Sequence, residues 1–472
     1  MIRPDDRLPR RTMLKRTGAV IATAAGGAVL AACGGAPAAP KPAEPAKPAE
    51  APKPAAAAPA APAAAPAAAA KPAAAGAITL KVIYWSSSPQ DHKVFEDTFK
   101  GFTDKNPNVK VDFDDIPDTE FVQKALAMIV GGTPPDTMEL HPAWVLNFIL
   151  ANQLNDLSDI AKNDKSAFIP QQLDFWSFQN KLYGVPYYSG PSFIYYNKTL
   201  FKKMGAKTPE EHEKDGTWTW DTLQALAKQV TGGSGAEKTF GWDASQNAVN
   251  LQFYTCVPIW CNQGELVDKE ETAWQLDSKP VIETMQWHAD MVLKDKSVPI
   301  PSDLQGISWL FKTGRLGMAW AGRFRSVELT NVDFEPAMVN TPKGKAGPVD
   351  RDGPNASGLP MGTKNVDAAY KLASFIGSAD AAPIYLASGR PVPVRTELLE
   401  SDAFKKSIKP YERIEVFANS TKRLRAWRIP GKGAEALRTV QAEWEKVLVG
   451  QQDVPTAMKA SKTAMDPLLK VR

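Results

Sequence analysis

The sequence predicts an α/β fold built as two lobes, which follows an export signal and a spacer. Two observations support this prediction. Residues 77–472 exceed the length, about 250–300 residues, at which a single hydrophobic core usually stops growing. The same region alternates β-prone stretches with segments whose apolar residues recur at helical spacing, and this alternation is typical of an α/β sheet.

An export pattern opens the chain. Arg10-Arg11 is followed three and four residues later by leucine and lysine, which resembles a twin-arginine signal. An uncharged stretch, residues 17–32, then ends in Leu-Ala-Ala before Cys33, and this ending is a lipobox. A transmembrane anchor is the competing interpretation, but a stretch this short and this rich in Ala and Gly falls below the roughly 20 apolar residues that span a bilayer.

We therefore expect residues 1–33 to be a signal peptide, with Cys33 lipidated and the protein held at the outer face of the cytoplasmic membrane. Residues 34–76 are almost entirely Ala and Pro with a few Lys and Glu. Because proline bars a continuous helix and favours extended polyproline conformations, this segment is expected to be a semi-rigid spacer. Such a spacer would lift the folded region off the membrane.

The net charge of the chain is +4, with 56 basic and 52 acidic residues. Ten of the basic and four of the acidic residues precede residue 77, so the rest of the chain is close to neutral. No basic run longer than a pair occurs there. A nucleic-acid partner needs a concentrated positive face, so nucleic acid is excluded as an expected partner.

Two cysteines remain once Cys33 is lipidated. Cys256 and Cys261 lie five residues apart in an exported chain, where disulfides persist. A regular helix would hold them too far apart, but Pro258 between them can break a helix. A disulfide is therefore the favoured interpretation, and free thiols stay open. Zinc is weaker because a structural site needs four ligands, so we expect no metal.

The first half of residues 77–472 begins with a strand at 78–84, a helix at 94–103 and a strand at 109–113. Three phenylalanines in this helix recur at the spacing of one helix face. Strand, helix and strand at this spacing open an α/β sheet. The next predicted elements are a helix at 120–130, a turn at 131–135, a strand at 137–140 and a helix at 143–154.

A crossing between the lobes is predicted at residues 184–190, where Gly and Pro precede a second β-prone stretch at 192–196. Thr219 can accept hydrogen bonds from the first amides of the helix that follows it. The later helices are predicted at 220–230, 280–293, 366–376, 433–448 and 455–469.

Eight short segments, in order, resemble one protein family. They include Phe102-Thr103-Asp104-Lys105-Asn106-Pro107, Gly131-Gly132-Thr133-Pro134-Pro135-Asp136, Lys181-Leu182-Tyr183-Gly184-Val185-Pro186, Trp218-Thr219-Trp220-Asp221 and Phe311-Lys312-Thr313-Gly314-Arg315-Leu316-Gly317-Met318-Ala319. Singly each motif is weak, but together they cover nearly all of residues 77–472. The region therefore resembles the family 1 extracellular solute-binding proteins of ABC importers, the group that includes maltose-binding protein.

The resemblance implies the type II fold of periplasmic binding proteins, with two α/β lobes joined by hinge crossings. The implied boundaries are residues 77–188 and 356–408 for the N-terminal lobe, and residues 189–355 and 409–472 for the C-terminal lobe. Crossings are expected near Pro186–Gly190 and Gly353–Ser357.

The resemblance also implies a function. The protein would be the extracytoplasmic binding component of an ABC importer, which captures a sugar or sugar-like solute between its lobes and delivers it to a permease. It would be a monomer without a cofactor, and it would not be an enzyme. All 13 tryptophans lie after residue 76, and aromatic faces stack on sugar rings.

By the same resemblance, loops from both lobes would line the ligand cleft. The expected ligand-binding residues are Trp85, Ser86, Glu139, Trp144, Tyr188, Tyr254, Trp320, Arg323 and Trp427. Each has a competing structural role, as a core residue or an ion-pair partner. Trp320 and Arg323 depart from the pattern of the maltose-binding branch. An arginine facing the cleft can bind a carboxylate or phosphate through two hydrogen bonds, so a charged sugar or a sugar phosphate stays open.

Three other functions stay open. A surface glycoside hydrolase or lyase would need paired carboxylates, and the usual hydrolase and phosphate-loop motifs are missing. A ferric-iron-binding protein of the same fold could use the tyrosine pairs at 187–188 and 195–196, although we expect the second pair to pack within a strand. A protein that presents its ligand to a sensor would share the same fold and cleft.

Overall fold

The computed structural model describes residues 77–86, 88–243, 251, 254–304, 307, 309–425 and 427–469. The chain divides into two units, residues 1–70 and 71–472, and all described residues belong to the second. The expected signal peptide, Cys33 and the Ala/Pro-rich spacer lie outside the described residues.

The strands confirm the predicted alternation. They are β1 (Ile78–Tyr84), β2 (Val109–Asp115), β3 (Thr137–Leu140), β4 (Ser177–Phe178), β5 (Lys181–Leu182), β6 (Val185–Tyr188), β7 (Ser192–Asn197), β8 (Phe240–Asp243), β9 (Leu316–Gly322), β10 (Pro336–Val339), β11 (Asp350–Arg351), β12 (Asn355–Gly358) and β13 (Leu424–Arg425).

The helices predicted from apolar spacing are also present, most of them within a few residues of the expected bounds. The structure has α1 (Pro89–Lys105), α2 (Asp118–Val130), α3 (Val145–Leu150), α4 (Pro170–Trp176), α5 (Lys198–Lys203), α6 (Pro209–Lys214), α7 (Trp220–Gln229), α8 (Cys256–Cys261), α9 (Lys279–Leu293), α10 (Pro301–Leu304), α11 (Val366–Ile376), α12 (Ala382–Tyr385), α13 (Asp402–Ser407), α14 (Ile414–Thr421), α15 (Gly433–Leu448) and α16 (Val454–Leu469).

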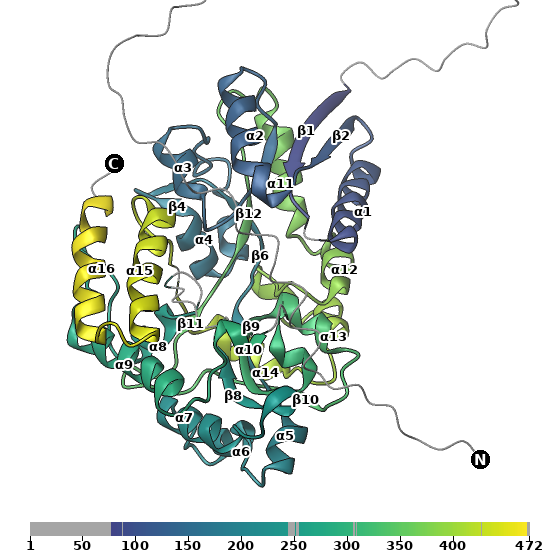
Figure 1. Cartoon of the computed structure of the whole chain (residues 1–472). Helices are drawn as coiled ribbons and strands as arrows, with labels where there is room; N and C mark the ends of the chain where they lie inside the picture. Colours follow the sequence, from purple (N-terminus) through teal and green to yellow (C-terminus); the bar gives the residue numbers. More distant parts are fainter. Residues whose placement is uncertain are drawn as a thin grey trace, which may run out of the picture. The chain divides into compact units, whose positions relative to one another are not determined.

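The first sheet has the strand order β2-β1-β3-β12-β6, and α1, α2 and α11 lie beside it (Figure 1). β1 runs parallel to β2 and β3, whereas β12 runs antiparallel to its two neighbours. Helix α1 begins where the Ser88 side chain accepts a hydrogen bond from the Asp91 backbone N–H at 3.2 Å. Phe99 and Phe102 on this helix are buried in the core of the sheet, as their spacing predicts.

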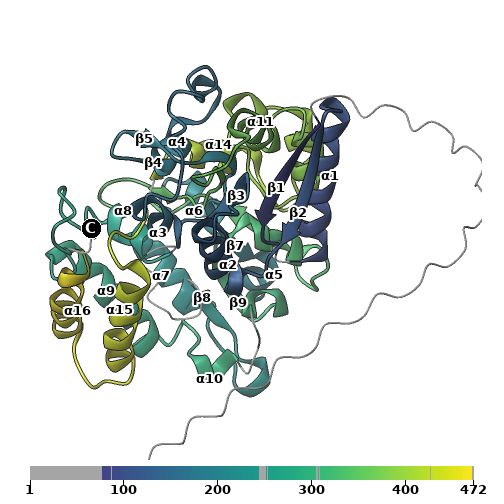
Figure 2. The same ribbon diagram turned by 90° about the horizontal axis from the view of Figure 1, so that it is seen from above.

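The second sheet has the order β10-β7-β9-β8, and both of its faces are covered. Every residue of β7 and β9 is buried. In β7, Ile194 and Tyr196 pack in one hydrophobic cluster, and Phe193 and Tyr195 pack in another, because successive side chains of a strand point to opposite faces. The Tyr195-Tyr196 pair therefore packs within a strand, as expected. The cluster that contains Ile194 and Tyr196 also contains buried side chains from α15 and α16, and these two helices run side by side (Figure 1 and Figure 2).

The two sheets are joined where residues 188–192 and 351–355 pass next to each other. The Gly353 backbone N–H donates to the Gly190 carbonyl oxygen at 3.2 Å. A third segment joins them, because Ser189 and Val392 exchange backbone hydrogen bonds of 3.2 and 2.9 Å. The buried apolar side chains from Ala381 to Phe404, apart from Val394, pack in a cluster on the second sheet. This part of the expected N-terminal lobe therefore packs largely against the other sheet.

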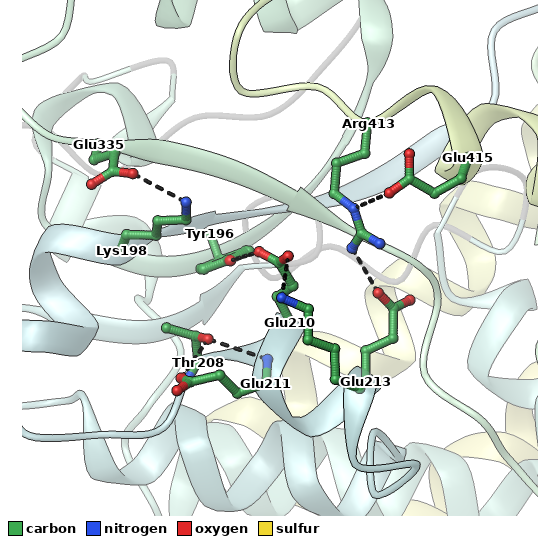
Figure 3. A network of polar contacts seen from close by, with 10 residues as sticks. Tyr196, Lys198, Thr208, Glu210, Glu211, Glu213, Glu335, Arg413 and Glu415 are labelled. Carbon is green, nitrogen blue, oxygen red and sulfur yellow. Dashed lines mark hydrogen bonds and ion pairs between the residues drawn. The ribbon is translucent and has the colours of Figure 1, made fainter.

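A polar network fixes the short helix α6 to its surroundings (Figure 3). The Tyr196 hydroxyl donates to Glu210 at 3.1 Å. Arg413 bridges Glu213 at 2.6 Å and Glu415 at 2.7 Å, which connects α6 with α14. Tyr196 comes from the second sheet, so these contacts hold α6 against that sheet.

The favoured disulfide is not formed. Cys256 and Cys261 are both free and buried, and together they bound helix α8. Pro258 falls in the first turn of this helix, where proline is tolerated, so it does not break the helix. A regular helix separates residues five apart by more than the roughly 7 Å that a disulfide can bridge. Burial raises the pKa of the Cys256 thiol to about 12 and that of Cys261 to about 11.

Candidate functional site

A cavity of about 690 Å³ lies between the two sheets. The first sheet contributes Glu139 from β3 and Tyr187 and Tyr188 from β6, and the second sheet contributes Ser192 from β7. The volume falls in the range of about 300–1,000 Å³ that is typical of small-molecule sites. The crossing residues Gly190, Gly353 and Asn355 also line this cavity.

A buried carboxylate stands in the wall formed by the first sheet. Glu139 is 1% exposed, and its oxygens accept hydrogen bonds from the Tyr187 hydroxyl at 2.6 Å, the Asn355 amide and the Trp85 backbone N–H at 3.1 Å. Burial raises the pKa of Glu139 to about 7, against the lowering effect of these donors. Near neutral pH this side chain therefore changes between an acceptor and a group that can also donate.

Aromatic side chains form much of the cavity lining. Trp85 follows β1 and meets His141 edge-on, with 6.1 Å between the ring centroids. Tyr188 and Tyr254 line the same cavity, and burial raises the pKa of both phenols, so both hydroxyls stay protonated. These rings combine apolar faces with hydrogen-bonding edges.

Three arginines line the cavity as well. Arg390 forms an ion pair with Asp91, and Arg325 forms one with Glu328 at 3.2 Å. The Arg325 guanidinium also lies 4.6 Å from the centroid of the Trp309 ring. Arg351 is 1% exposed, and burial lowers the pKa of its guanidinium to about 10, so it remains charged at neutral pH.

Of the nine expected ligand-binding residues, four line this cavity: Trp85, Glu139, Tyr188 and Tyr254. Five are not among its lining residues: Ser86, Trp144, Trp320, Arg323 and Trp427. The reasons differ from residue to residue.

Ser86 and Trp144 contact residues of the first sheet and of the helices beside it. The Ser86 backbone N–H donates to Asp115 at 2.9 Å, and its hydroxyl donates to the same carboxylate. Trp144 stacks on Phe121 with a centroid distance of 5.8 Å and packs against the core of the first sheet. Their neighbours in sequence, Trp85 and His141, line the cavity instead.

Trp320 and Trp427 are core residues. Trp320 is 3% exposed and stacks on Trp220 with a centroid distance of 5.5 Å. Its expected place in the cleft is wrong because β9 is covered on both faces. Trp427 donates from its indole nitrogen to the Leu251 carbonyl oxygen at 3.1 Å and packs edge-on against Trp260.

The expectation that Arg323 faces the cleft is also wrong. Its guanidinium is fully buried and forms an ion pair of 2.9 Å with Glu412, which is also fully buried. It donates further to the Pro391 carbonyl oxygen at 2.6 Å and to the Ser407 carbonyl oxygen at 3.0 Å. The Phe417 ring lies 4.8 Å from the guanidinium carbon. These contacts occupy the donors that a bound anion would have needed.

Sequence reasoning missed Arg351, Arg390 and Asn355 as cavity residues. Asn355 lies within the predicted crossing at Gly353–Ser357, and Arg351 lies two residues before it. Residues at a crossing lie between the two lobes, so their position next to the predicted crossing could have identified them as cavity residues. Arg390 had no such signal, because the third connecting segment was not predicted.

The part of the chain that the structure describes carries neither a metal-binding cluster nor a membrane-spanning helix. No group of three or more His, Cys, Asp and Glu side chains there is arranged to hold a metal ion. Of the two tyrosine pairs, only Tyr187-Tyr188 reaches the cavity. Among those same residues, no helix has the length and apolar character needed to cross a bilayer.

Comparisons with known proteins agree with this architecture. Residues 84–383, more than half of the chain, match the family model described as bacterial extracellular solute-binding protein. A binding protein of Brucella abortus is 25% identical over 338 residues, which cover 70% of this chain and 79% of the relative.

Solved structures show the same fold. An ABC substrate-binding protein from Listeria monocytogenes, in complex with cycloalternan, has a TM-score of 0.71 and 22% identity, covering 84% of this chain and 100% of that chain. UgpB from Mycobacterium tuberculosis, in complex with glycerophosphocholine, has a TM-score of 0.70 and 20% identity, covering 82% and 98%. The expected two-lobe α/β fold is thereby confirmed.

Proposed function

Because the chain belongs to the bacterial extracellular solute-binding proteins, we propose that it is the binding component of an ABC importer and captures a sugar or sugar-like solute. The observation that carries this proposal is the cavity of about 690 Å³, in which Trp85, Tyr188 and Glu139 are brought together. The solute would then be delivered to a permease. The Listeria protein in complex with cycloalternan supports the sugar class.

The chemistry of the cavity suits a polyhydroxylated ring. Aromatic faces such as those of Trp85 and Tyr254 can cover the apolar face of a sugar. Hydroxyl groups at the ring edge need donors and acceptors, which the Asn355 amide and the Tyr188 phenol supply. No covalent step is proposed, because binding and release are all that a transport component performs.

Closure of the two lobes around the solute would be the signal for its delivery to the permease. The cavity takes side chains from both sheets, and a ligand that contacts both at once stabilises the closed arrangement. The segments around Gly190 and Gly353 would act as the hinge, because they connect the sheets and lie against each other. We propose lobe boundaries at these two crossings, whereas residues 381–404, which pack largely against the second sheet, do not support the boundary expected after residue 408.

The family is extracytoplasmic. Within that location, we propose that the protein is exported by the twin-arginine route and anchored by lipid at Cys33 on the outer face of the cytoplasmic membrane. The support is the Arg10-Arg11 pattern and the lipobox in the sequence. We further propose a monomer, since one chain supplies both walls of the cavity.

A thermal-shift screen of the purified protein tests the function, because a ligand that binds only the folded state raises the melting temperature. The panel contains mono- and oligosaccharides, sugar phosphates, amino acids and ferric iron. A shift of several degrees with one class of sugar is expected. A shift with ferric iron or an amino acid, and none with any sugar, would overturn the sugar assignment.

A matched pair of tryptophan variants locates the site. Trp85→Ala should weaken binding of the sugar found in the screen at least about tenfold, because stacking surface inside the cavity is lost. Trp144→Ala removes an equally large ring from the same part of the fold, outside the cavity lining. Equal affinity in the two variants would place the solute elsewhere.

A further inference from the structure

We propose that the solute is an acetylated sugar, and that the Tyr385 hydroxyl donates a hydrogen bond to its acetyl carbonyl where the cavity borders helix α1. The inference rests on the proposed function and specifies the substrate class of the same cavity. It concerns a residue that sequence reasoning did not single out. Tyr385 is the last residue of α12, lines the cavity and is 5% exposed.

Helix α1 presents one face to the cavity. Its lining residues recur at the spacing i, i+3, i+4 and i+7, which places them on the same side of a helix: Asp91, Val94, Phe95 and Thr98. Asp91 forms an ion pair with Arg390, and the other three side chains are uncharged. Beyond this ion pair, the wall that α1 contributes is therefore mainly apolar.

This wall is continuous with the part of the cavity around Glu139. The Phe95 ring lies 6.2 Å from the Tyr187 ring, centroid to centroid, and the Tyr187 hydroxyl donates to Glu139 at 2.6 Å. Helices α11 and α12 pack against α1 (Figure 1), and their last residues, Ile376 and Tyr385, also line the cavity. A solute held at Glu139 can therefore extend along α1 towards Tyr385.

Three hydroxyl side chains lie in this part of the lining, and two of them already donate to the backbone. The Thr98 hydroxyl donates to the Val94 carbonyl oxygen at 2.7 Å, and the Ser388 hydroxyl donates to the Tyr385 carbonyl oxygen at 2.8 Å. The Tyr385 hydroxyl is buried and has no hydrogen-bond partner within the part of the chain that the structure describes. Burial raises the pKa of this phenol, so the hydroxyl keeps its proton and can donate.

A buried hydroxyl without a partner calls for an explanation. Nearly all buried polar groups in folded proteins are hydrogen-bonded, because a group left without a partner loses its hydration and gains nothing. Other tyrosines of this chain follow the rule: the Tyr196 hydroxyl donates to Glu210 at 3.1 Å, and the Tyr411 hydroxyl donates to the Ser326 carbonyl oxygen at 2.5 Å. Because Tyr385 belongs to the cavity wall, a bound solute can supply the acceptor that it lacks.

The lining around Tyr385 suits a substituent with one acceptor and an apolar remainder. A sugar hydroxyl placed against Val94, Phe95 and Ile376 would lose its water and find no partner there. An acetyl group combines a carbonyl oxygen, which accepts from a phenol, with a methyl group, which gains by burial against apolar side chains. N-acetyl and O-acetyl sugars share this chemistry, and matched probes distinguish them.

The first test is isothermal titration of the wild-type protein with pairs of probes. The pairs are glucose with N-acetylglucosamine, galactose with N-acetylgalactosamine, and glucose with 6-O-acetylglucose. At least one acetylated probe should bind about tenfold or more tighter than its parent sugar, because the parent leaves the Tyr385 hydroxyl without an acceptor. Acetylated probes that all bind no tighter than their parents would overturn the inference.

A single-atom substitution gives the second arm. Tyr385→Phe keeps the ring and removes only the hydroxyl oxygen. It should reduce affinity for the acetylated probe at least about fivefold and leave that for the parent sugar within a factor of about two. Tyr196→Phe, in the network on α6 outside the cavity lining (Figure 3), is the matched control and should bind both probes as the wild type does.

Melting temperatures without any ligand test the premise. Tyr385→Phe removes a hydroxyl that has no partner, so its melting temperature should equal or exceed that of the wild type. Tyr196→Phe removes a hydroxyl that donates to Glu210, so its melting temperature should fall. A fall in Tyr385→Phe as large as that in Tyr196→Phe would mean that the Tyr385 hydroxyl is already satisfied, by the protein or by water, and would overturn the inference.

The outcomes separate the inference from the function on which it rests. Binding of a plain sugar as tightly as its acetylated partner, unaffected by Tyr385→Phe, would overturn the acetylated class while the sugar-binding function stands. Binding only of a solute without a sugar part would overturn both. A preference for an acetylated probe that is lost in Tyr385→Phe and kept in Tyr196→Phe would support both.

Discussion

The carboxylate of Asp352 accepts a hydrogen bond from the backbone N–H of Gly190 at 2.7 Å. These two residues belong to two of the three segments that connect the sheets, so this bond fastens one crossing to the other. Asp352 is 4% exposed, and it also accepts from the Ser189 hydroxyl at 2.8 Å and from the Gln172 amide. Burial raises the pKa of this carboxyl despite these donors. The crossings that we propose as the hinge thus share a buried polar centre at Asp352.

Removing this centre should destabilise the protein. Asp352→Ala leaves the donors of Gly190, Ser189 and Gln172 without their acceptor, and we expect a loss of roughly 2–4 kcal/mol in the free energy of unfolding. Urea denaturation followed by circular dichroism measures it. Asp97→Ala, which removes an exposed partner of Lys93, is the control and should cost less than about 1 kcal/mol. Equal losses would argue against the role of Asp352.

Two tryptophans with the same expected role should behave differently. Trp320→Ala removes a ring that is 3% exposed from the core of the second sheet, so unfolding should become easier by about 3–5 kcal/mol. Trp85→Ala should act mainly on ligand affinity, since Trp85 is only partly buried at the cavity. Thermal unfolding without and with the sugar identified in the screen compares them. A more stable Trp320→Ala than Trp85→Ala would contradict this assignment.

The fold was largely predictable from the sequence because its signals are local. The three phenylalanines of α1 recur at helical spacing. Strand β3 lies between the proline-containing turn at 131–135 and the helix α3. The crossing at Gly353 was marked by glycine and proline. The third connecting segment was not predicted, because the pairing of Ser189 with Val392 joins residues about 200 positions apart.

The site was only partly predictable because burial and pairing are not local. Trp320 looked like a stacking residue, but whether β9 is covered on both faces depends on helices far along the chain. Arg323 looked like an anion-binding residue, but Glu412, its partner, follows 89 residues later. Arg351 was overlooked because its two neighbours are acidic and its exposure can be known only from the fold.

The buried ion pair of Arg323 and Glu412 gives a third prediction. Arg323→Met should cost about 3–5 kcal/mol, because the charge of Glu412 would stay buried without its partner. The double variant Arg323→Met, Glu412→Leu should be more stable than Arg323→Met alone, since it leaves no uncompensated charge. Urea denaturation of the wild type, Arg323→Met, Glu412→Leu and the double variant measures the coupling free energy between the two residues. Additive losses would contradict a coupled pair.

The same arginine should not affect ligand binding directly. Arg323 is not among the residues that line the cavity, and its donors are satisfied by Glu412 and by carbonyl oxygens. At a temperature where Arg323→Met is folded, its affinity for the solute should equal that of the wild type within a factor of about three. A loss as large as that expected for Trp85→Ala, about tenfold, would return Arg323 to the site.

The raised pKa of Glu139 predicts a pH dependence of stability. The carboxyl has an ordinary pKa of 4.5 in the unfolded chain and a pKa of about 7 in the folded protein. Between these values the unfolded state binds fewer protons, so the free energy of unfolding falls as pH rises towards 7 and then levels off. This group should account for a loss of roughly 3 kcal/mol between pH 4 and pH 8.

Glu139→Gln isolates this contribution, because an amide of similar shape does not titrate. The difference in unfolding free energy between the variant and the wild type should therefore shift in favour of the variant by roughly 3 kcal/mol from pH 4 to pH 8. Histidines that are buried in the neutral form, such as His288 with a pKa of about 4, act in the opposite direction, but they are common to both proteins and cancel in the difference. Glu335→Gln, at an exposed ion pair with Lys198, should give a profile parallel to the wild type. Parallel profiles for Glu139→Gln would mean that the carboxylate is better solvated than its burial indicates.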